Sequence, residues 1–129
     1  MISNYSHHSD RFVGDRWILC GDAAVFLDPI FSSAVHVSVT SARFASKVVI
    51  NAFRHGELLT SNGTGEKYQA NLLRGVHRFH NLISLFYRTN FVEGMKKTLQ
   101  RENMRQAFTS AVAGDVWDDE NIIFKMKVL

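Results

Sequence analysis

The sequence of 129 residues contains one cysteine and one proline, and it has no apolar run near the ~18 residues that a membrane-spanning helix needs. The single thiol, Cys20, cannot form an internal disulfide, which favours a reducing compartment. The first eight residues lack the apolar segment of a secretory signal. We therefore expect a cytoplasmic protein that has no membrane as a partner.

Internal repeats, low-complexity tracts and long runs of one charge are also missing. Hydrophobic residues make up 46% of the chain and charged residues 21%, as in globular domains and unlike disordered or fibrous chains. The net charge is +3, and the basic residues of the middle segment, 29–110, are scattered along it. No nucleic-acid-binding signature accompanies them. We expect a solvated basic helix surface and no nucleic-acid partner.

Periodicity predicts a mainly α chain with one short strand and about three helices. The apolar run Arg16–Cys20, closed by Gly21-Asp22, is typical of a buried strand. The apolar loop 23–33, which contains Pro29, is expected to lie in the interior or against a ligand. A lone strand leaves its backbone groups without partners, so the pattern indicates that the chain is part of a larger fold.

Three segments have helical spacing. In the first, 33–55, Ser32 or Ser33 can cap the start and Gly56 marks the end. Its apolar residues at helical spacing are Val35, Val39, Ala42, Ala45 or Ser46, Val49 and Phe53. The second helix follows a polar linker at 58–64 and carries the regular stripe Tyr68, Leu72, Val76, Phe79, Ile83, Phe86 and Asn90. The third is expected from Glu93 or Met95 to about Val112.

Residues 14–36 contain the features that indicate ligand binding. A strand that ends in Gly21-Asp22 places a carboxylate at its carboxyl end, where α/β folds bind ligands and where it can accept hydrogen bonds from sugar-like hydroxyls. The next helix begins at Ser33, and its free N–H groups favour anions and electron-rich oxygens. Together these features predict a two-sided clamp for a polyhydroxylated, partly anionic ligand.

The same residues resemble the second FAD-binding motif of the flavin monooxygenase superfamily. Its Gly-Asp-Ala-Ala…Asp-Pro pattern corresponds to 21–24 and 28–29. The longer form Phe-Leu-Asp-Pro-Ile-Phe-Ser-Ser-x-Val-His, at 26–36, most resembles the flavin-dependent halogenases, of the tryptophan halogenase type. The flanks at 5–6, 14–17, 83–88 and 113–117 are similar to the same family. The resemblance covers almost the whole chain.

The resemblance implies the C-terminal part of an α/β FAD-binding fold of the Rossmann-like, glutathione-reductase type, with FAD as cofactor and chloride or bromide as co-substrate. Gly21 and Asp22 would belong to the cofactor-binding site, in which Asp22 would hold the ribityl hydroxyls of FAD, and Asp28 and Pro29 would form the turn beside the flavin. The backbone N–H groups of Ser33, Ala34 and Val35 would face the pyrimidine end. Ser33 and Ala34 also match a halide site, at which the family usually has glycine in place of Ala34.

Other parts of the family pattern are missing from these residues. The sequence has no Gly-x-Gly-x-x-Gly motif for the FAD pyrophosphate, and it lacks the lysine and the Trp-x-Trp signature of halogenases. We therefore expect no catalytic residue here, a second FAD-binding motif at 1–56 and a helical region at 57–129. In the whole enzyme, the partners would be a separate flavin reductase and an aromatic or carrier-tethered substrate.

Several alternatives remain open at this stage. The chain could derive from an FAD-dependent hydroxylase or a prenyl reductase, or it could be a non-catalytic helical remnant or interaction module whose apolar faces need a partner. Asp22 could cap a turn, and Asp28 before Pro29 could form an Asx turn. Cys20 is expected to be an inert core residue.

Two further groups of residues are not interpreted as metal sites. His77 and His80 are three residues apart, but no third metal ligand accompanies them at helical spacing. The acidic residues of 115–120 lack the spaced glycine of a calcium loop. They are interpreted as a solvated tail that carries an exposed tryptophan, Trp117.

Overall fold

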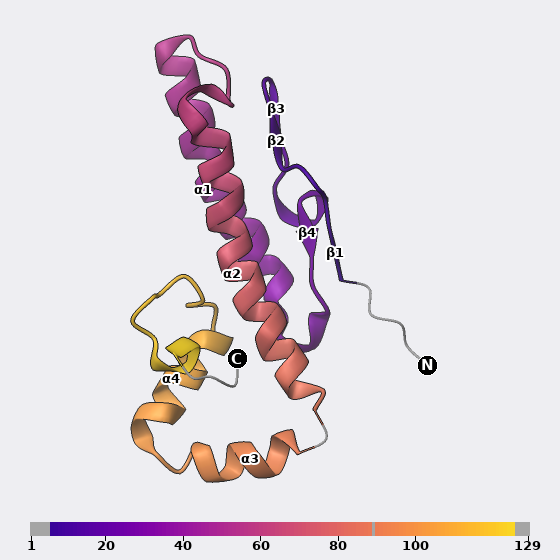
Figure 1. The fold of residues 1–129 in the computed structure, drawn as a ribbon, viewed down its shortest axis with the longest axis vertical. Helices are drawn as coiled ribbons and strands as arrows, with labels where there is room; N and C mark the ends of the chain where they lie inside the picture. Colours follow the sequence, from indigo (N-terminus) through magenta and orange to yellow (C-terminus); the bar gives the residue numbers. More distant parts are fainter. Residues whose placement is uncertain (1–5, 89, 126–129) are drawn as a thin grey trace. The chain divides into compact units, whose positions relative to one another are not determined.

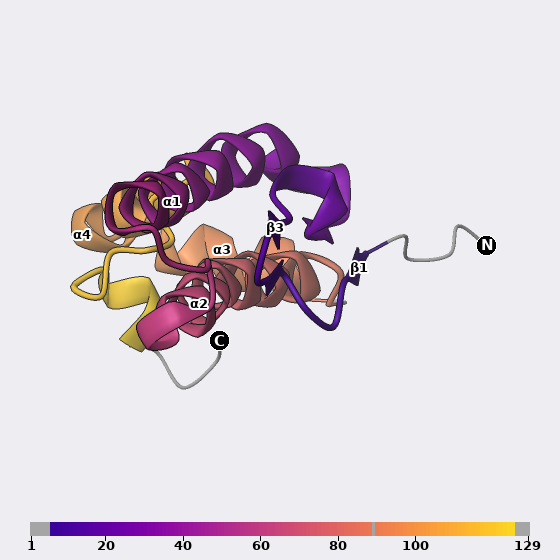
Figure 2. The same cartoon turned by 90° about the horizontal axis from the view of Figure 1, so that it is seen from above.

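The computed structural model describes residues 6–88 and 90–125 (Figures 1 and 2). Residue 5 of the upstream flank lies outside this range. The chain divides into two compact units, 1–74 and 75–129, and the boundary falls inside the helix α2. The described part is mainly helical, as predicted. The division at residue 56, which rests on the motif alone, stays a prediction.

The first unit opens with four strands of two residues each. β1 (His7–His8) pairs antiparallel with β4 (Val25–Phe26), and β2 (Val13–Gly14) pairs antiparallel with β3 (Trp17–Ile18). The single buried strand expected at 16–20 is therefore wrong. It is one arm of a hairpin whose Trp17 is 46% exposed, and its partner is only two residues upstream. The strand at 16–20 therefore has a local partner, β2, and its backbone groups do not by themselves require a larger fold.

Two helices complete the first unit. α1 (Ser33–His55) ends as predicted, because Gly56 adopts the left-handed conformation with φ +65°. α2 (Thr64–Phe86) begins after a short turn, and its first half returns in the direction opposite to α1 (Figure 1). The hairpin β2–β3 contacts this half of α2. The Tyr68 hydroxyl donates to the Leu19 carbonyl at 2.6 Å, and the Phe12 N–H donates to the Gln69 side-chain oxygen at 2.9 Å.

The stripe predicted on α2 is confirmed as far as Phe86, where the helix ends, and its last predicted member, Asn90, lies beyond α2. Its five residues from Tyr68 to Ile83 are buried, and Phe86 is half-buried. A regular 3–4 spacing keeps these side chains on one side of the helix, where burial of apolar area stabilises the fold.

The second unit contains the rest of α2, then α3 (Phe91–Thr98) and α4 (Glu102–Val112). The third helix predicted from 93 or 95 to 112 is thus two helices. The break lies at 99–101, where Arg101 takes an extended conformation, with ψ 123°. A 3-10 turn, η4 (Ile122–Lys125), closes the described chain.

Candidate functional site

The first candidate residues, Gly21 and Asp22, lie on a 3-10 turn, η1 (Gly21–Ala23), which contacts α1. The Gly21 N–H donates to the Ser41 hydroxyl of α1 at 2.8 Å. Gly21 has φ +58°, and a Cβ built on it would lie 3.0 Å from the Ser38 hydroxyl oxygen. Close approach and a positive φ both require glycine here. Asp22 follows directly, exposed, and its carboxylate has no hydrogen bond or ion pair with a described residue.

The second candidate segment is the Asp28-Pro29 turn. An Asp28 carboxylate oxygen accepts a hydrogen bond from the Ile30 N–H at 3.1 Å, and Pro29 opens the 3-10 turn η2 (Pro29–Phe31). The Asx-turn interpretation of Asp28 is therefore confirmed. The loop is only partly interior, since Val25 and Leu27 are buried whereas Ile30 is exposed. η2 contacts α1 and delivers the chain to its first residue.

The start of α1 differs from the expected capped terminus. Ser32 is the N-cap residue, but it lies in the left-handed region at φ 53° and its side chain makes no capping hydrogen bond. No described group accepts a hydrogen bond from the backbone N–H of Ser33, Ala34 or Val35. The predicted cap by Ser32 or Ser33 is therefore wrong. The first turn instead presents its N–H groups, which carry the positive end of the helix dipole.

Ser33 adds a second unusual feature at the same position. Its side chain is 2% exposed, and its hydroxyl is the one buried side-chain N or O atom without a hydrogen-bond partner among the described residues. A buried hydroxyl without a partner costs free energy, so each such group calls for an explanation. Ala34 lies inside the helix, without a positive φ. Alanine can therefore occupy this position without backbone strain.

Of the two halves of the expected clamp, η1 contacts α1, and the other half is the first turn of α1 itself. η1 contacts the helix at Ser38 and Ser41, five and eight residues after Ser33. At 1.5 Å per residue, these contacts lie roughly 8–12 Å along the axis from the free first turn. The arrangement suits an elongated ligand with hydroxyls at one end and hydrogen-bond acceptors at the other. Sequence reasoning missed Ser38 and Ser41, which have no pattern that distinguishes them from other helical serines.

The remaining candidate residues take other places. Cys20 is exposed, so its assignment to the core is wrong. Its segment is the edge of a small hairpin and does not enter the interior. His77 and His80 are exposed on α2, and the described residues contain no group of three side chains that could hold a metal ion. In the same described part, no helix is long and apolar enough to span a membrane.

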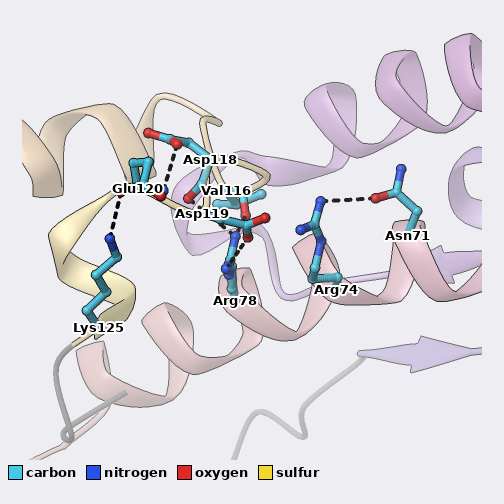
Figure 3. Close-up of polar contacts among 8 residues, drawn as sticks. All are labelled: Asn71, Arg74, Arg78, Val116, Asp118, Asp119, Glu120 and Lys125. Carbon is cyan, nitrogen blue, oxygen red and sulfur yellow. Dashed lines mark hydrogen bonds and ion pairs between the residues drawn. The ribbon is translucent and has the colours of Figure 1, made fainter.

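The acidic segment after α4 is a folded loop and not a free tail, although Asp115, Asp119 and Glu120 are exposed as expected. Arg78 of α2 donates to the Val116 carbonyl at 2.8 Å and pairs with the Asp119 carboxylate at 2.7 Å (Figure 3). Its guanidinium also lies 4.7 Å from the centre of the Phe124 ring. Trp117 is half-buried and lies against Gly75. A basic residue and a glycine on α2 therefore hold this loop, in a way that the local sequence did not reveal.

Comparison with known proteins identifies relatives of one kind. The chain is 32% identical, over 120 residues, to the 1H-pyrrole-2-carbonyl-[peptidyl-carrier protein] chlorinase of Pseudomonas fluorescens, covering 93% of this chain and 26% of the chlorinase. It is 40% identical over 52 residues to the flavin-dependent halogenase armH5 of Armillaria mellea, covering 40% of this chain and 10% of that protein. No protein-family model matches the chain.

The fold is similar to that of a solved flavin-dependent halogenase. The solved structure of the flavin-dependent brominase Bmp2 matches with a TM-score of 0.79 and 26% identity, covering 93% of this chain and 30% of that chain. This chain spans about a quarter of the chlorinase's length. The homologues of this chain are flavin-dependent halogenases, over the segment that it spans. The resemblance of the motif to that family is thereby confirmed.

Proposed function

We propose that this chain supplies, within a flavin-dependent halogenase-like oxidoreductase, the surface that holds the ribityl and pyrimidine side of FAD. Asp22, next to Gly21 in the cofactor-binding site, would hold the ribityl hydroxyls, and the turn at Asp28-Pro29 would lie beside the flavin. The N–H groups of Ser33, Ala34 and Val35 would donate to the acceptors of the pyrimidine ring. The motif therefore forms one functional region at 1–56, with 57–129 as helical support.

The free first turn of α1 is the observation that carries this proposal. Its N–H groups lack described acceptors, and the Ser33 hydroxyl beside them is buried without a partner. A pyrimidine ring with carbonyl oxygens and a ring nitrogen offers acceptors of the kind that these donors lack. The free Asp22 carboxylate offers acceptors to hydroxyl groups. These residues therefore fit a flavin, on which the relatives depend according to their names.

The chemistry itself would belong to the cofactor. Reduced FAD would react with oxygen to supply the oxidant for chloride or bromide. The residues of this chain would bind and orient the flavin, and we assign none of them to catalysis. Ser33 and Ala34 would also adjoin a halide. The helical φ of Ala34 removes the need for a backbone shift, so a halide site there would depend only on space for the methyl group.

The partners follow from the same proposal. A separate flavin reductase would supply reduced FAD, and the substrate would be an aromatic molecule, either free or tethered to a carrier protein. The name of the P. fluorescens relative describes a tethered pyrrole, which supports the second form for a related enzyme. We place the protein in the cytoplasm, where a single unpaired thiol stays reduced.

A chimera tests the flavin assignment. This chain would replace the matched 120-residue segment of the P. fluorescens chlorinase, and bound FAD would be titrated by flavin fluorescence. Asp22→Ala should weaken FAD binding about 10- to 100-fold, as expected for a lost charged hydrogen bond, and Ser33→Ala about 2- to 10-fold. Asp10→Ala, at an exposed position outside the motif, is the matched control.

The assignment is contradicted if Asp22→Ala and Ser33→Ala leave the FAD affinity within twofold of the parent chimera. For the isolated chain we expect weak or no FAD binding, because these residues include no pyrophosphate-binding motif. Tight, stoichiometric FAD on the isolated chain would contradict that expectation.

A further inference from the structure

Helix α1 carries apolar side chains on two different faces. The inner face is buried and is made of small and branched residues: Ser33, Val37, Thr40, Ser41, Ala45, Val48 and Ala52. The face predicted from the sequence is a different one. It contains Val35, which is 73% exposed, and Phe53, which is 85% exposed. Most of the predicted stripe faces solvent in this chain, whereas its predicted member Ala45 is buried and Val49 is half-buried.

We call the exposed residues Val35, Val39, Ala42, Ile50 and Phe53 the outer stripe. At 100° per residue they lie within about 80° of the helix circumference, and they extend along about 27 Å of its axis. Single exposed apolar residues are ordinary, but a stripe of five, interrupted by the exposed Ser46, indicates an interaction surface. Only a narrow basic seam, with Arg43, Lys47 and Arg54, separates the outer stripe from the inner face. α1 therefore has an exposed apolar stripe in addition to its buried face, which is expected of a helix that packs on two sides.

We propose that the outer stripe packs against the portion of a flavin-dependent halogenase fold that lies outside the segment this chain spans, so that α1 becomes a central, fully buried helix. The inference rests on the proposed function and names the partner of the same site. That portion is large, since the chain covers 26% of the chlorinase and 30% of Bmp2.

The position of the stripe supports this occupant over a second copy of the chain. The outer stripe begins at Val35, one of the three residues whose N–H groups would face the flavin. A cofactor held at that turn needs walls on its other sides, and the protein that supplies them would also adjoin Val35. The same contact would continue along α1 to Phe53, and it would remove the cost of exposing the stripe to water.

A lysine at the far end of the stripe tests the proposal. Phe53 lies 20 residues after Ser33, about 30 Å along the helix, so Phe53→Lys does not touch the flavin-facing turn. In the isolated chain the side chain is exposed, and we expect the melting temperature to stay within about 2 °C. In the chlorinase chimera the lysine would be buried, and we expect loss of most soluble protein or melting at least about 5 °C lower.

Asn51→Lys is the matched control. It places the same residue two positions away at an exposed site, about 160° around the helix, and should leave both proteins unchanged. The proposal is overturned by an insoluble parent chimera, by a Phe53→Lys chimera as stable as its parent, or by equal losses from both variants. It is also overturned if the isolated chain sediments as a dimer that Phe53→Lys dissociates, because the occupant is then a second copy.

Failure of this inference and failure of the proposed function give different results. A stable Phe53→Lys chimera that retains FAD would overturn the docking surface and leave the flavin assignment intact. A parent chimera that folds, loses stability with Phe53→Lys and binds no FAD would overturn the flavin assignment and leave the docking surface intact.

Discussion

Replacing Ser33 with alanine should make the isolated chain more stable while weakening the binding of its ligand. The Ser33 hydroxyl is buried and has no partner among the described residues. An unsatisfied buried polar group costs about 1–3 kcal/mol, and that cost disappears when the oxygen is removed. The void that an oxygen leaves is small, so little packing is lost.

We expect the free energy of unfolding to rise by about 1–2 kcal/mol, because the small void left by the oxygen offsets part of the relieved penalty. Alanine also has a slightly higher helix propensity than serine, by up to about 0.5 kcal/mol. Ser46→Ala isolates this second contribution. Ser46 lies on the same helix, and its exposed hydroxyl donates to the Arg43 carbonyl at 2.9 Å.

Urea unfolding of the full chain, followed by circular dichroism, measures both variants. Ser33→Ala should move the midpoint to higher urea at an unchanged slope, and Ser46→Ala should shift it much less. The reasoning is refuted if Ser33→Ala destabilises the chain, because its hydroxyl would then have a partner. Equal gains from both variants would refute it as well, because helix propensity alone would explain them.

Three further outcomes are expected from packing and titration. Gly75→Ala should destabilise the chain by about 2 kcal/mol and red-shift tryptophan fluorescence, because a Cβ at this position would displace the Trp117 ring. Gly94→Ala, whose added Cβ would have no heavy atom within 4 Å, should instead stabilise the chain by up to about 1 kcal/mol. Gly21→Ala should cost about 1–2 kcal/mol in thermal unfolding, because φ is +58° and the Ser38 hydroxyl lies 3.0 Å away; an unchanged melting temperature would contradict this. Burial raises the pKa of Tyr68 above its ordinary value of 10.0, so the unfolded chain releases this proton first and stability falls as pH rises above about 10. Tyr68→Phe should flatten that fall in pH-dependent urea unfolding, and an equally steep fall would show that other groups cause it.

The sequence predicted the helices well where one periodic pattern dominated. The stripe from Tyr68 to Ile83 and the end of α1 at Gly56 depend on local spacing and on one glycine conformation. Both are therefore visible without tertiary contacts. The hairpin was missed, although Gly14-Asp15 before Trp17 is a turn signal, because the apolar run at 16–20 was interpreted without its neighbour Val13.

The faces of α1 show the limit of sequence patterns most clearly. Periodicity identified an apolar stripe through Val35 and Phe53, but both faces of the helix are apolar and a pattern cannot rank them. The fold buries the face whose small residues let η1 and η2 approach, as the Gly21 N–H and the Ser41 hydroxyl demonstrate at 2.8 Å. Shape at that contact decided which face turned inward.

The sequence by itself indicated the family that this segment resembles. The motif at 21–36 pointed to the flavin-dependent halogenases, because motif residues are local in the chain and their spacing survives without a structure. Only the tertiary structure showed that Ser32 does not cap α1, that the Ser33 hydroxyl has no described partner and that Trp117 lies against Gly75. Hydrogen bonding and close packing depend on distances between residues far apart in sequence, and no local pattern encodes them.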